Sequence, residues 1–167
     1  MRIIGDIHGC YTALQQAITP WDEKTLYIFC GDYLERGIEN KEMIYEMMRL
    51  STLPNTIMLE GNHERHIANF AFNTNLDHSK RFMKEVVAPI VKDMTKKDVE
   101  SLQRELRLFY KSLRQCYPFS FHGKKYLVSH AGLSYVPNMT FIATSTFING
   151  FGAYETCLLY TSPSPRD

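Results

Sequence analysis

The sequence predicts an α/β fold built on a largely parallel sheet, and two observations lead to this prediction. Short apolar runs typical of buried strands alternate with segments of helical periodicity in the N-terminal part of the chain. The order strand, helix, strand, helix, strand is typical of βαβ units, whose strands are parallel. The chain has 167 residues, of which 44% are hydrophobic, and this is enough for one domain with a buried core.

The N-terminal elements follow from local pattern. Each expected strand is a short apolar run bounded by a glycine, and each expected helix repeats its apolar residues at helical spacing. The strands are expected at Arg2–Gly5, Leu26–Cys30 and Thr56–Leu59. The helices between them are expected at Tyr11–Ile18 and Lys41–Leu50.

The later part of the chain predicts longer helices and a hairpin. A helix is expected over Asp77–Asp93, with an interruption at Pro89 because proline disrupts a helix interior. Thr95 resembles an N-cap, and Asp98 stands three residues on in a weak capping-box pattern, so a second helix is expected from there to about Gln115. Two short strands, Phe119–His122 and Tyr126–Ser129, are expected to form a hairpin around residues 123–125.

The amino-acid composition excludes few classes of function. The net charge of +1 gives no electrostatic argument for a membrane or nucleic-acid partner, although it does not exclude nucleic acid. No apolar stretch is long enough for a membrane span, for which about 20 residues are needed. The cysteines are far apart, which indicates neither a zinc knuckle nor a disulfide framework, so a reducing cytoplasm is the expected location. They are Cys10, Cys30, Cys116 and Cys157.

The last eleven residues, 157–167, differ in character from the rest of the chain. Their Ser/Pro alternation can form neither a helix nor a central strand. The string resembles the translation of a sequencing adapter, and the alternative is a natural proline-rich tail. The adapter interpretation predicts a domain over residues 1–156 that is truncated at its C-terminus, followed by a non-native segment over residues 157–167.

Polar residues of the kinds that bind metals follow each expected early strand and the second strand of the hairpin. In parallel α/β sheets, ligands bind beyond the carboxyl ends of the strands, so these loops are expected to meet at one rim. Neighbouring glycines allow tight turns there. The candidate metal-binding residues are Asp6, His8, Asp32, Asn62 and His130.

This set of side chains indicates a particular chemistry. Carboxylate, imidazole and amide groups without a thiolate suit manganese, iron or zinc. Two carboxylates and two imidazoles exceed the needs of one ion, and one carboxylate can bridge two ions, which lower the pKa of a shared water to give a bridging hydroxide nucleophile. A phosphate ester is the expected target, because Arg36 adds a planar, charged donor for its oxygens.

The four loops resemble the phosphoprotein-phosphatase branch of the calcineurin-like metallophosphoesterases. The family signatures G-D-x-H-G, G-D-x-x-D-R-G, G-N-H-E and H-A-G occur in order between Gly5 and Gly132, with one departure. The resemblance implies a four-layer α/β/β/α sandwich. It also implies that Asp6, His8 and Asp32 hold one metal, and that Asp32, Asn62 and His130 hold a second.

The same resemblance implies the remaining roles. His63 would protonate the leaving oxygen, and Arg36 would grip the phosphate, with Asn62 also at the phosphate. Glu35 stands where the family usually has aspartate, and it is expected to keep the role of orienting His63 although it is one methylene longer. The family's further metal-binding histidine and second phosphate-binding arginine have no counterpart after His130, so the second metal site is expected to be incomplete in this chain.

The expected function is that of a phosphomonoesterase of the serine/threonine protein phosphatase type. Two alternatives stay open: a hydrolase directed at nucleotides, such as dinucleoside polyphosphates or RNA-end phosphates, and an inactive fragment or binding module. Taken singly, each motif is more often an ordinary loop, and only the joint occurrence carries the interpretation. His66, one helical turn after His63, is expected at the surface.

Overall fold

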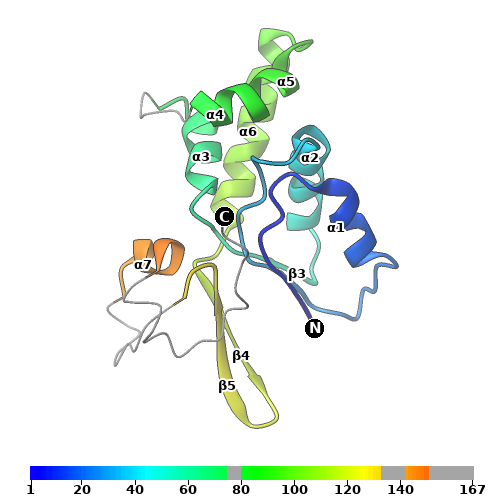
Figure 1. Cartoon of the computed structure of the whole chain (residues 1–167), viewed down its shortest axis with the longest axis vertical. Coiled ribbons are helices and arrows are strands. Elements are labelled where there is room, and N and C mark those ends of the chain that lie inside the picture. Colours follow the sequence, from blue (N-terminus) through cyan, green and yellow to red (C-terminus); the bar gives the residue numbers. More distant parts are fainter. Residues whose placement is uncertain (75–79, 133–141, 151–167) are drawn as a thin grey trace.

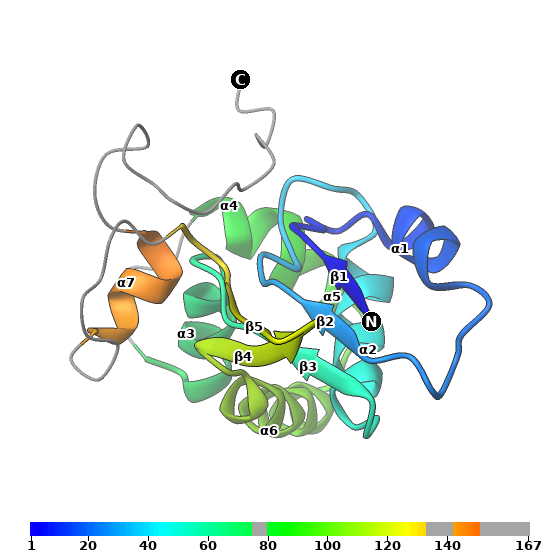
Figure 2. The ribbon, with the colours of Figure 1, turned by 90° about the horizontal axis from the view of Figure 1, so that it is seen from below.

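The first three strands form a parallel sheet, as the alternating pattern predicts. The computed structural model describes residues 1–74, 80–132 and 142–150. Within them the sheet has the order β1-β2-β3, formed by β1 (Arg2–Ile4), β2 (Tyr27–Phe29) and β3 (Thr56–Met58) (Figure 2). Ile3 pairs with Ile28, and Ile28 pairs with Ile57. All three residues of β2 are fully buried, as expected of the central strand.

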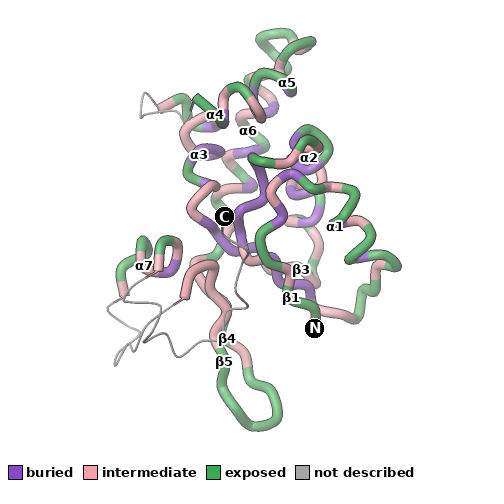
Figure 3. Tube along the Cα trace, in the orientation of Figure 1, coloured by how far each residue is buried: buried purple, intermediate pink, exposed green. Residues whose placement is uncertain are grey.

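The helices that connect and cover the sheet bury one face each. They are α1 (Tyr11–Ile18), α2 (Asn40–Ser51), α3 (Glu64–Phe72) and α6 (Lys96–Ser112). Helix α6 packs against both α3 and α2, and its buried residues Leu102, Leu106 and Phe109 recur at helical spacing. Figure 3 shows the buried residues concentrated where these helices meet the sheet and its loops.

Helix α6 begins as predicted and ends earlier. Thr95 and Asp98 form a reciprocal capping box, so the predicted N-terminus is confirmed. The helix stops at Ser112 rather than near Gln115, because the backbone of Arg114 pairs in parallel with the end of β3. The Arg114 N–H donates to the Met58 carbonyl over 2.9 Å, which ties the segment before the hairpin to the parallel sheet.

The hairpin consists of β4 (Cys116–Phe121) and β5 (Lys124–Ser129), which pair antiparallel (Figure 2). The predicted connection at residues 123–125 is wrong, because Lys124 and Lys125 belong to the second strand. The turn is His122-Gly123 alone, with φ values of 48° and 74°. Two consecutive positive φ angles are typical of a two-residue type I′ turn, which suits the twist of a hairpin.

The predicted helix around Pro89 is present in its described part, from residue 80 onward, but its interruption lies one turn earlier than expected. The segment consists of α4 (Lys80–Phe82), a π-helix η1 (Met83–Val87) and α5 (Ala88–Val91). Pro89 has no N–H for the Glu85 carbonyl, and its ring would collide with that carbonyl in a regular helix. The wider π turn before Pro89 removes this conflict, and the helix continues through the proline.

A short helix, α7 (Thr144–Asn149), lies next to the end of β5 (Figure 1). The Ala131 N–H donates to the carbonyl of Phe147 over 3.0 Å and so connects the two. Within the residues that the structure describes, no helix has both the length and the apolar character needed to cross a membrane.

The packing of α6 gives the first prediction. Leu106 is fully buried, whereas Leu108 on the same helix is 67% exposed. We expect Leu106→Ala to lower the free energy of unfolding by about 2–5 kcal/mol, because it leaves a cavity in the core. We expect the matched control Leu108→Ala to change it by no more than about 0.5 kcal/mol. Urea denaturation of both variants measures this, and equal effects would contradict the observed packing.

Candidate metal centre

Four loops meet at one rim of the sheet, as the sequence predicts. The backbone of the loop after β1 pairs with the loop after β2, because the N–H of His8 donates to the carbonyl of Asp32 over 2.9 Å. The loop after β3 joins them, because the N–H of His63 donates to Asp32 Oδ1 over 3.1 Å. His130, directly after β5, donates from Nδ1 to the Cys30 carbonyl over 2.8 Å. Candidate residues more than 100 positions apart are thus brought together.

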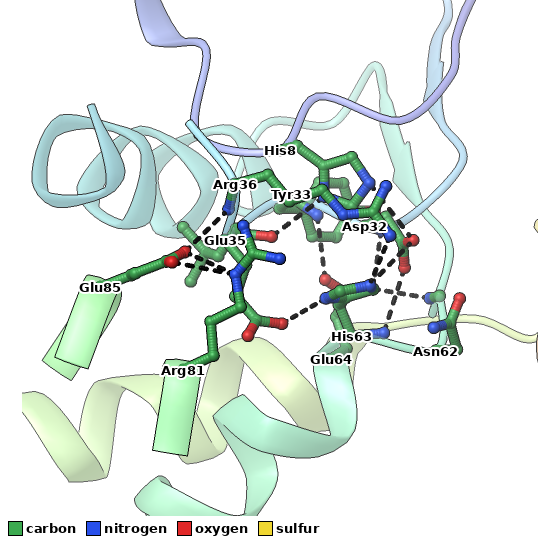
Figure 4. Close-up of polar contacts among 12 residues, drawn as sticks. His8, Asp32, Tyr33, Glu35, Arg36, Asn62, His63, Glu64, Arg81 and Glu85 are labelled. Carbon is green, nitrogen blue, oxygen red and sulfur yellow. Dashed lines mark hydrogen bonds and ion pairs between the residues drawn. The ribbon is translucent and has the colours of Figure 1, made fainter. Parts of the chain in front are cut away.

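Asp32 lies at the centre of this arrangement. Its side chain is only 5% exposed, and three imidazole nitrogens face its two oxygens. Oδ2 lies 3.7 Å from His8 Nε2 and 3.8 Å from His63 Nε2, and Oδ1 lies 3.5 Å from His130 Nε2. Figure 4 shows Asp32 and His63 facing one another beside Asn62. This buried carboxylate is therefore shared by side chains from every one of the other loops.

Two of the imidazoles have their tautomer fixed by a carbonyl. His8 Nδ1 lies 3.2 Å from the Leu34 carbonyl, and His130 Nδ1 contacts the Cys30 carbonyl. A carbonyl only accepts hydrogen bonds, so Nδ1 carries the hydrogen in both rings. In the neutral form of such a ring, Nε2 carries a lone pair. Burial lowers the pKa of His8 and outweighs the opposing effects of the Leu34 carbonyl and Asp32, which favours the neutral ring.

The Nε2 atoms of both rings face oxygen acceptors. His8 Nε2 is buried and has no hydrogen-bond partner among the described residues. His130 Nε2 lies 3.1 Å from Asn62 Oδ1 and faces Asp32 Oδ1. Electron-rich atoms placed together in this way repel one another unless a cation lies between them. A histidine that donates Nδ1–H to a carbonyl and offers Nε2 inward is also the usual form of a metal ligand.

The described residues contain two groups whose ligand atoms lie within 4.8 Å of one another. One group is Asp6, Asp32 and His130, and the other is His8, Asp32 and His63. Asp32 belongs to both, as a bridging carboxylate would. The grouping differs in part from the one that the family resemblance implies, because Asp6 lies with His130 and His63 replaces Asp6 beside His8. The donor atoms fit hard or borderline cations such as manganese, iron or zinc.

Glu35 reaches His63 despite the departure from the family signature. Its carboxylate contacts His63 Nδ1, and its side chain is only 3% exposed. Arg36 lies on the other side of the same ring, with Nη2 3.5 Å from His63 Nε2. Both residues have left-handed backbone, with φ values of 71° and 67°. Such a conformation costs a non-glycine residue about 1–2 kcal/mol and is typically held by its surroundings at functional sites.

The glycines of the motifs allow the loops to approach closely. A Cβ at Gly61 would lie 2.4 Å from Asp32 Oδ1. A Cβ at Gly37 would lie 2.2 Å from the carbonyl of His8. These distances are too short for any side chain, so the close packing of the loops depends on glycine at both positions.

Sequence reasoning missed Glu64, the last residue of the G-N-H-E motif. Its fully buried carboxylate accepts hydrogen bonds from the backbone N–H groups of Asp32, Tyr33 and Gly61 over 2.9, 3.0 and 2.7 Å. Burial and the Asp32 carboxylate raise the pKa of Glu64 to about 8 although these donors oppose the shift. Glu64 thus joins the loops after β2 and β3 beneath Asp32. Its place in the G-N-H-E motif was the available signal.

The prediction that His66 lies at the surface is wrong. His66 is 9% exposed, and its ring lies 6.3 Å from that of His63 and 5.6 Å from that of Phe82. Phe82 belongs to the helical segment 80–91, and its ring lies against His66 of α3. Helical periodicity on α3 alone could not reveal a partner that comes from a later part of the chain.

A rim of carboxylate, imidazole and amide groups around one shared aspartate defines an α/β protein with a candidate two-metal centre. A sequence model of the Calcineurin-like phosphoesterase family matches residues 2–156. The chain belongs to this family, whose members hydrolyse phosphoester bonds with the help of metal ions, and its fold is the mixed α/β fold of that family.

Two individual similarities accompany the family match. The chain is 32% identical over 132 residues to Serine/threonine-protein phosphatase 2 from Salmonella typhimurium, a match that covers 77% of this chain and 56% of that protein. The chain therefore spans about half the length of this curated relative. A solved crystal structure with the provisional description of a diadenosine tetraphosphatase has 20% identity and a TM-score of 0.41, covering 68% of this chain and 42% of that chain.

Glu64 gives a pH prediction for the metal-free protein. Its folded-state pKa of about 8 lies above the ordinary value of 4.5, so the native state keeps a proton that the unfolded chain releases between these values. The stability that this proton contributes is lost as the pH rises through this window, by up to about 1.4 kcal/mol per pH unit. In EDTA, we expect urea denaturation to give a lower free energy of unfolding at about pH 8 than at about pH 7.

The variant Glu64→Gln is the control for this measurement. We expect a lower free energy of unfolding at both pH values, because the amide hydrogens face the backbone donors that the carboxylate accepts from. The difference between the two pH values should disappear, since the titrating group is gone. An unchanged pH dependence in Glu64→Gln would assign it to another group.

Proposed function

We propose that this protein is a metal-dependent phosphomonoesterase of the serine/threonine protein phosphatase type. One observation carries the proposal: the lone pairs of His8, His130 and Asn62 and both oxygens of Asp32 point into the same space, where a cation would satisfy all of them. Membership of the Calcineurin-like phosphoesterase family supports the same chemistry.

The residues at the rim would hold two metal ions. Following the family resemblance rather than the grouping of ligand atoms described above, we assign Asp6, His8 and Asp32 to the first and Asp32, Asn62 and His130 to an incomplete second site. Manganese, iron and zinc are the candidate metals. When bound, a metal pair lowers the pKa of a shared water and neutralises charge on the phosphate. The Nδ1–H bonds of His8 and His130 to carbonyls orient the two rings for this role.

Arg36 and Asn62 would bind the phosphate. The guanidinium of Arg36 lies beside His63 at the exposed side of the rim. Its planar set of N–H donors can take two phosphate oxygens at once, and it stays charged at every physiological pH. The Asn62 side chain lies next to His130, from where its amide can reach both a metal and a phosphate oxygen.

His63 would act as the general acid. Glu35 contacts its Nδ1, so the other nitrogen, Nε2, faces Asp32 and Arg36 where the reaction would occur. A proton held at Nε2 would pass to the leaving oxygen of the ester as the bond to phosphorus breaks. Glu35 would be a positioning residue, because it fixes the ring without contacting the substrate itself.

The substrate class is the finer part of the proposal. Phosphoserine or phosphothreonine in a protein is the expected substrate, and the similarity to a serine/threonine-protein phosphatase supports this choice. The same metal pair would also serve a nucleotide substrate, because fold and metals do not set the leaving group. We therefore expect manganese-dependent turnover of a phosphopeptide to exceed that of a dinucleoside tetraphosphate and of a bis-aryl phosphate. The opposite order would favour the nucleotide-directed or diesterase alternatives.

The role of His63 gives a sharper prediction. We expect His63→Asn to lower kcat on a phosphoserine peptide by about 10²–10⁴-fold, because an alkoxide leaves poorly without a proton donor. The loss should be much smaller on para-nitrophenyl phosphate, whose leaving group needs no proton. Manganese affinity, measured by calorimetry, should change little if His63 is an acid rather than a ligand.

Two controls accompany this variant. His122→Asn makes the same change in the exposed hairpin turn, where asparagine tolerates the left-handed backbone, and should leave kcat unchanged. Asp32→Asn should abolish manganese binding and turnover together, because it removes the carboxylate shared by both ligand groups. Equal losses on both substrates in His63→Asn would contradict the proposed proton transfer.

A further inference from the structure

The Glu35-Arg36 turn has two left-handed residues in succession, so it needs bonds that hold it. The N–H of Glu35 donates to Asn40 Oδ1 over 2.9 Å. The N–H of Arg36 lies 3.3 Å from Glu85 Oε2. Asn40 is a neighbour in sequence, but Glu85 comes from the distant helical segment 80–91. Both acceptors lie outside the signature motifs, and Glu85 is also distant in sequence.

Glu85 has its carboxylate oriented by Arg81. The Nε of Arg81 lies 2.9 Å from both Oε1 and Oε2 of Glu85, one helical turn away (Figure 4). This bond also lowers the pKa of Glu85, so the carboxylate is ionised. The Arg81 side chain is 55% exposed, and a pair as exposed as this contributes little to global stability. The effect of the pair is thus on the direction of the carboxylate rather than on folding.

The backbone of Glu85 is directed at the same loop by the π-helix. Pro89 is four residues after Glu85 and cannot donate to its carbonyl. That carbonyl instead lies 3.4 Å from Nδ2 of Asn40, whose Nδ2 also donates to the Gly37 carbonyl over 2.7 Å. Pro89 therefore leaves this backbone acceptor without its usual helical donor, and the carbonyl and the side chain of Glu85 both face the Arg36 loop. Turns of the π type occur frequently at functional sites.

We propose that Glu85, held by Arg81, is a positioning residue for the phosphate-binding Arg36. The helical segment 80–91 would thereby set the direction from which Arg36 approaches the phosphate, which none of the four signature motifs specifies. The proposal rests on the proposed phosphate-binding role of Arg36. It predicts that loss of the pair weakens phosphate binding and leaves the metal ligands unaffected, because the bonds go to the turn and not to Asp32, His8 or His130.

Three single variants of the full chain and one double variant test this proposal. Glu85→Ala removes the acceptor for the Arg36 N–H, and we expect the affinity for inorganic phosphate to fall about fivefold or more in the presence of manganese. Glu85→Gln keeps an acceptor but loses the ion pair, and Arg81→Met loses only the ion pair. We expect each of these two to weaken phosphate binding less than Glu85→Ala, and their double variant to be no weaker than either single one, because both act through the same carboxylate.

The control is Lys92→Met, which removes an exposed cation just beyond the same segment and should leave phosphate affinity unchanged. Calorimetric titration with phosphate, titration with manganese, and the melting temperature are measured for every variant. Weaker phosphate binding with unchanged manganese affinity and melting temperature supports the proposal. Phosphate affinity equal to wild type in Glu85→Ala overturns it. Failure of the wild-type chain to bind manganese or phosphate would instead overturn the proposed function, and this inference with it.

Discussion

The candidate site depends on the placement of one buried carboxylate, that of Asp32, against nitrogen and oxygen lone pairs. Its oxygens face His8, His63 and His130 within 4 Å, and two of these rings have their hydrogen committed to a carbonyl. Such an arrangement is unfavourable in the absence of a cation, because buried acceptors without donors lose their solvation. The surrounding fold must therefore hold the groups in place, and metal binding would release the repulsion that the fold maintains.

The neighbouring structure supplies that restraint. The buried carboxylate of Glu64 accepts hydrogen bonds from three backbone N–H groups. These bonds connect the loops after β2 and β3. Gly61 and Gly37 allow the loops to approach so closely that any side chain at these positions would collide with the neighbouring loop. The left-handed backbone at His8 and Asp32 adds strain of the kind that functional loops commonly store. The central sheet and α6 provide the buried apolar contacts against which this strain is held.

Local sequence pattern predicted the parallel strands, the first two helices and the capping box at Thr95, because each follows from periodicity or from a short capping signal. The convergence of the loops after β1, β2 and β3, which carry candidate ligands, was also predictable, since it follows from the parallel order of these strands. Two of the errors have a different cause. The end of α6 depends on a bond between Arg114 and β3, and the burial of His66 depends on Phe82. Contacts between segments distant in sequence determine both the end of α6 and the burial of His66. Local sequence patterns do not reveal such contacts.

The site likewise contains residues that sequence motifs identify and residues that only the structure reveals. The groups proposed for metal binding and proton transfer come from short motifs that sequence alone identifies. Glu64, Asn40 and Glu85 accept hydrogen bonds from backbone N–H groups of these loops, and Asn40 and Glu85 lie outside every signature motif. If Glu85 positions Arg36 as proposed, a change in the helical segment 80–91 would redirect this arginine without altering any motif. Specificity within a family that shares its metal ligands can therefore reside in segments that motif comparison does not register.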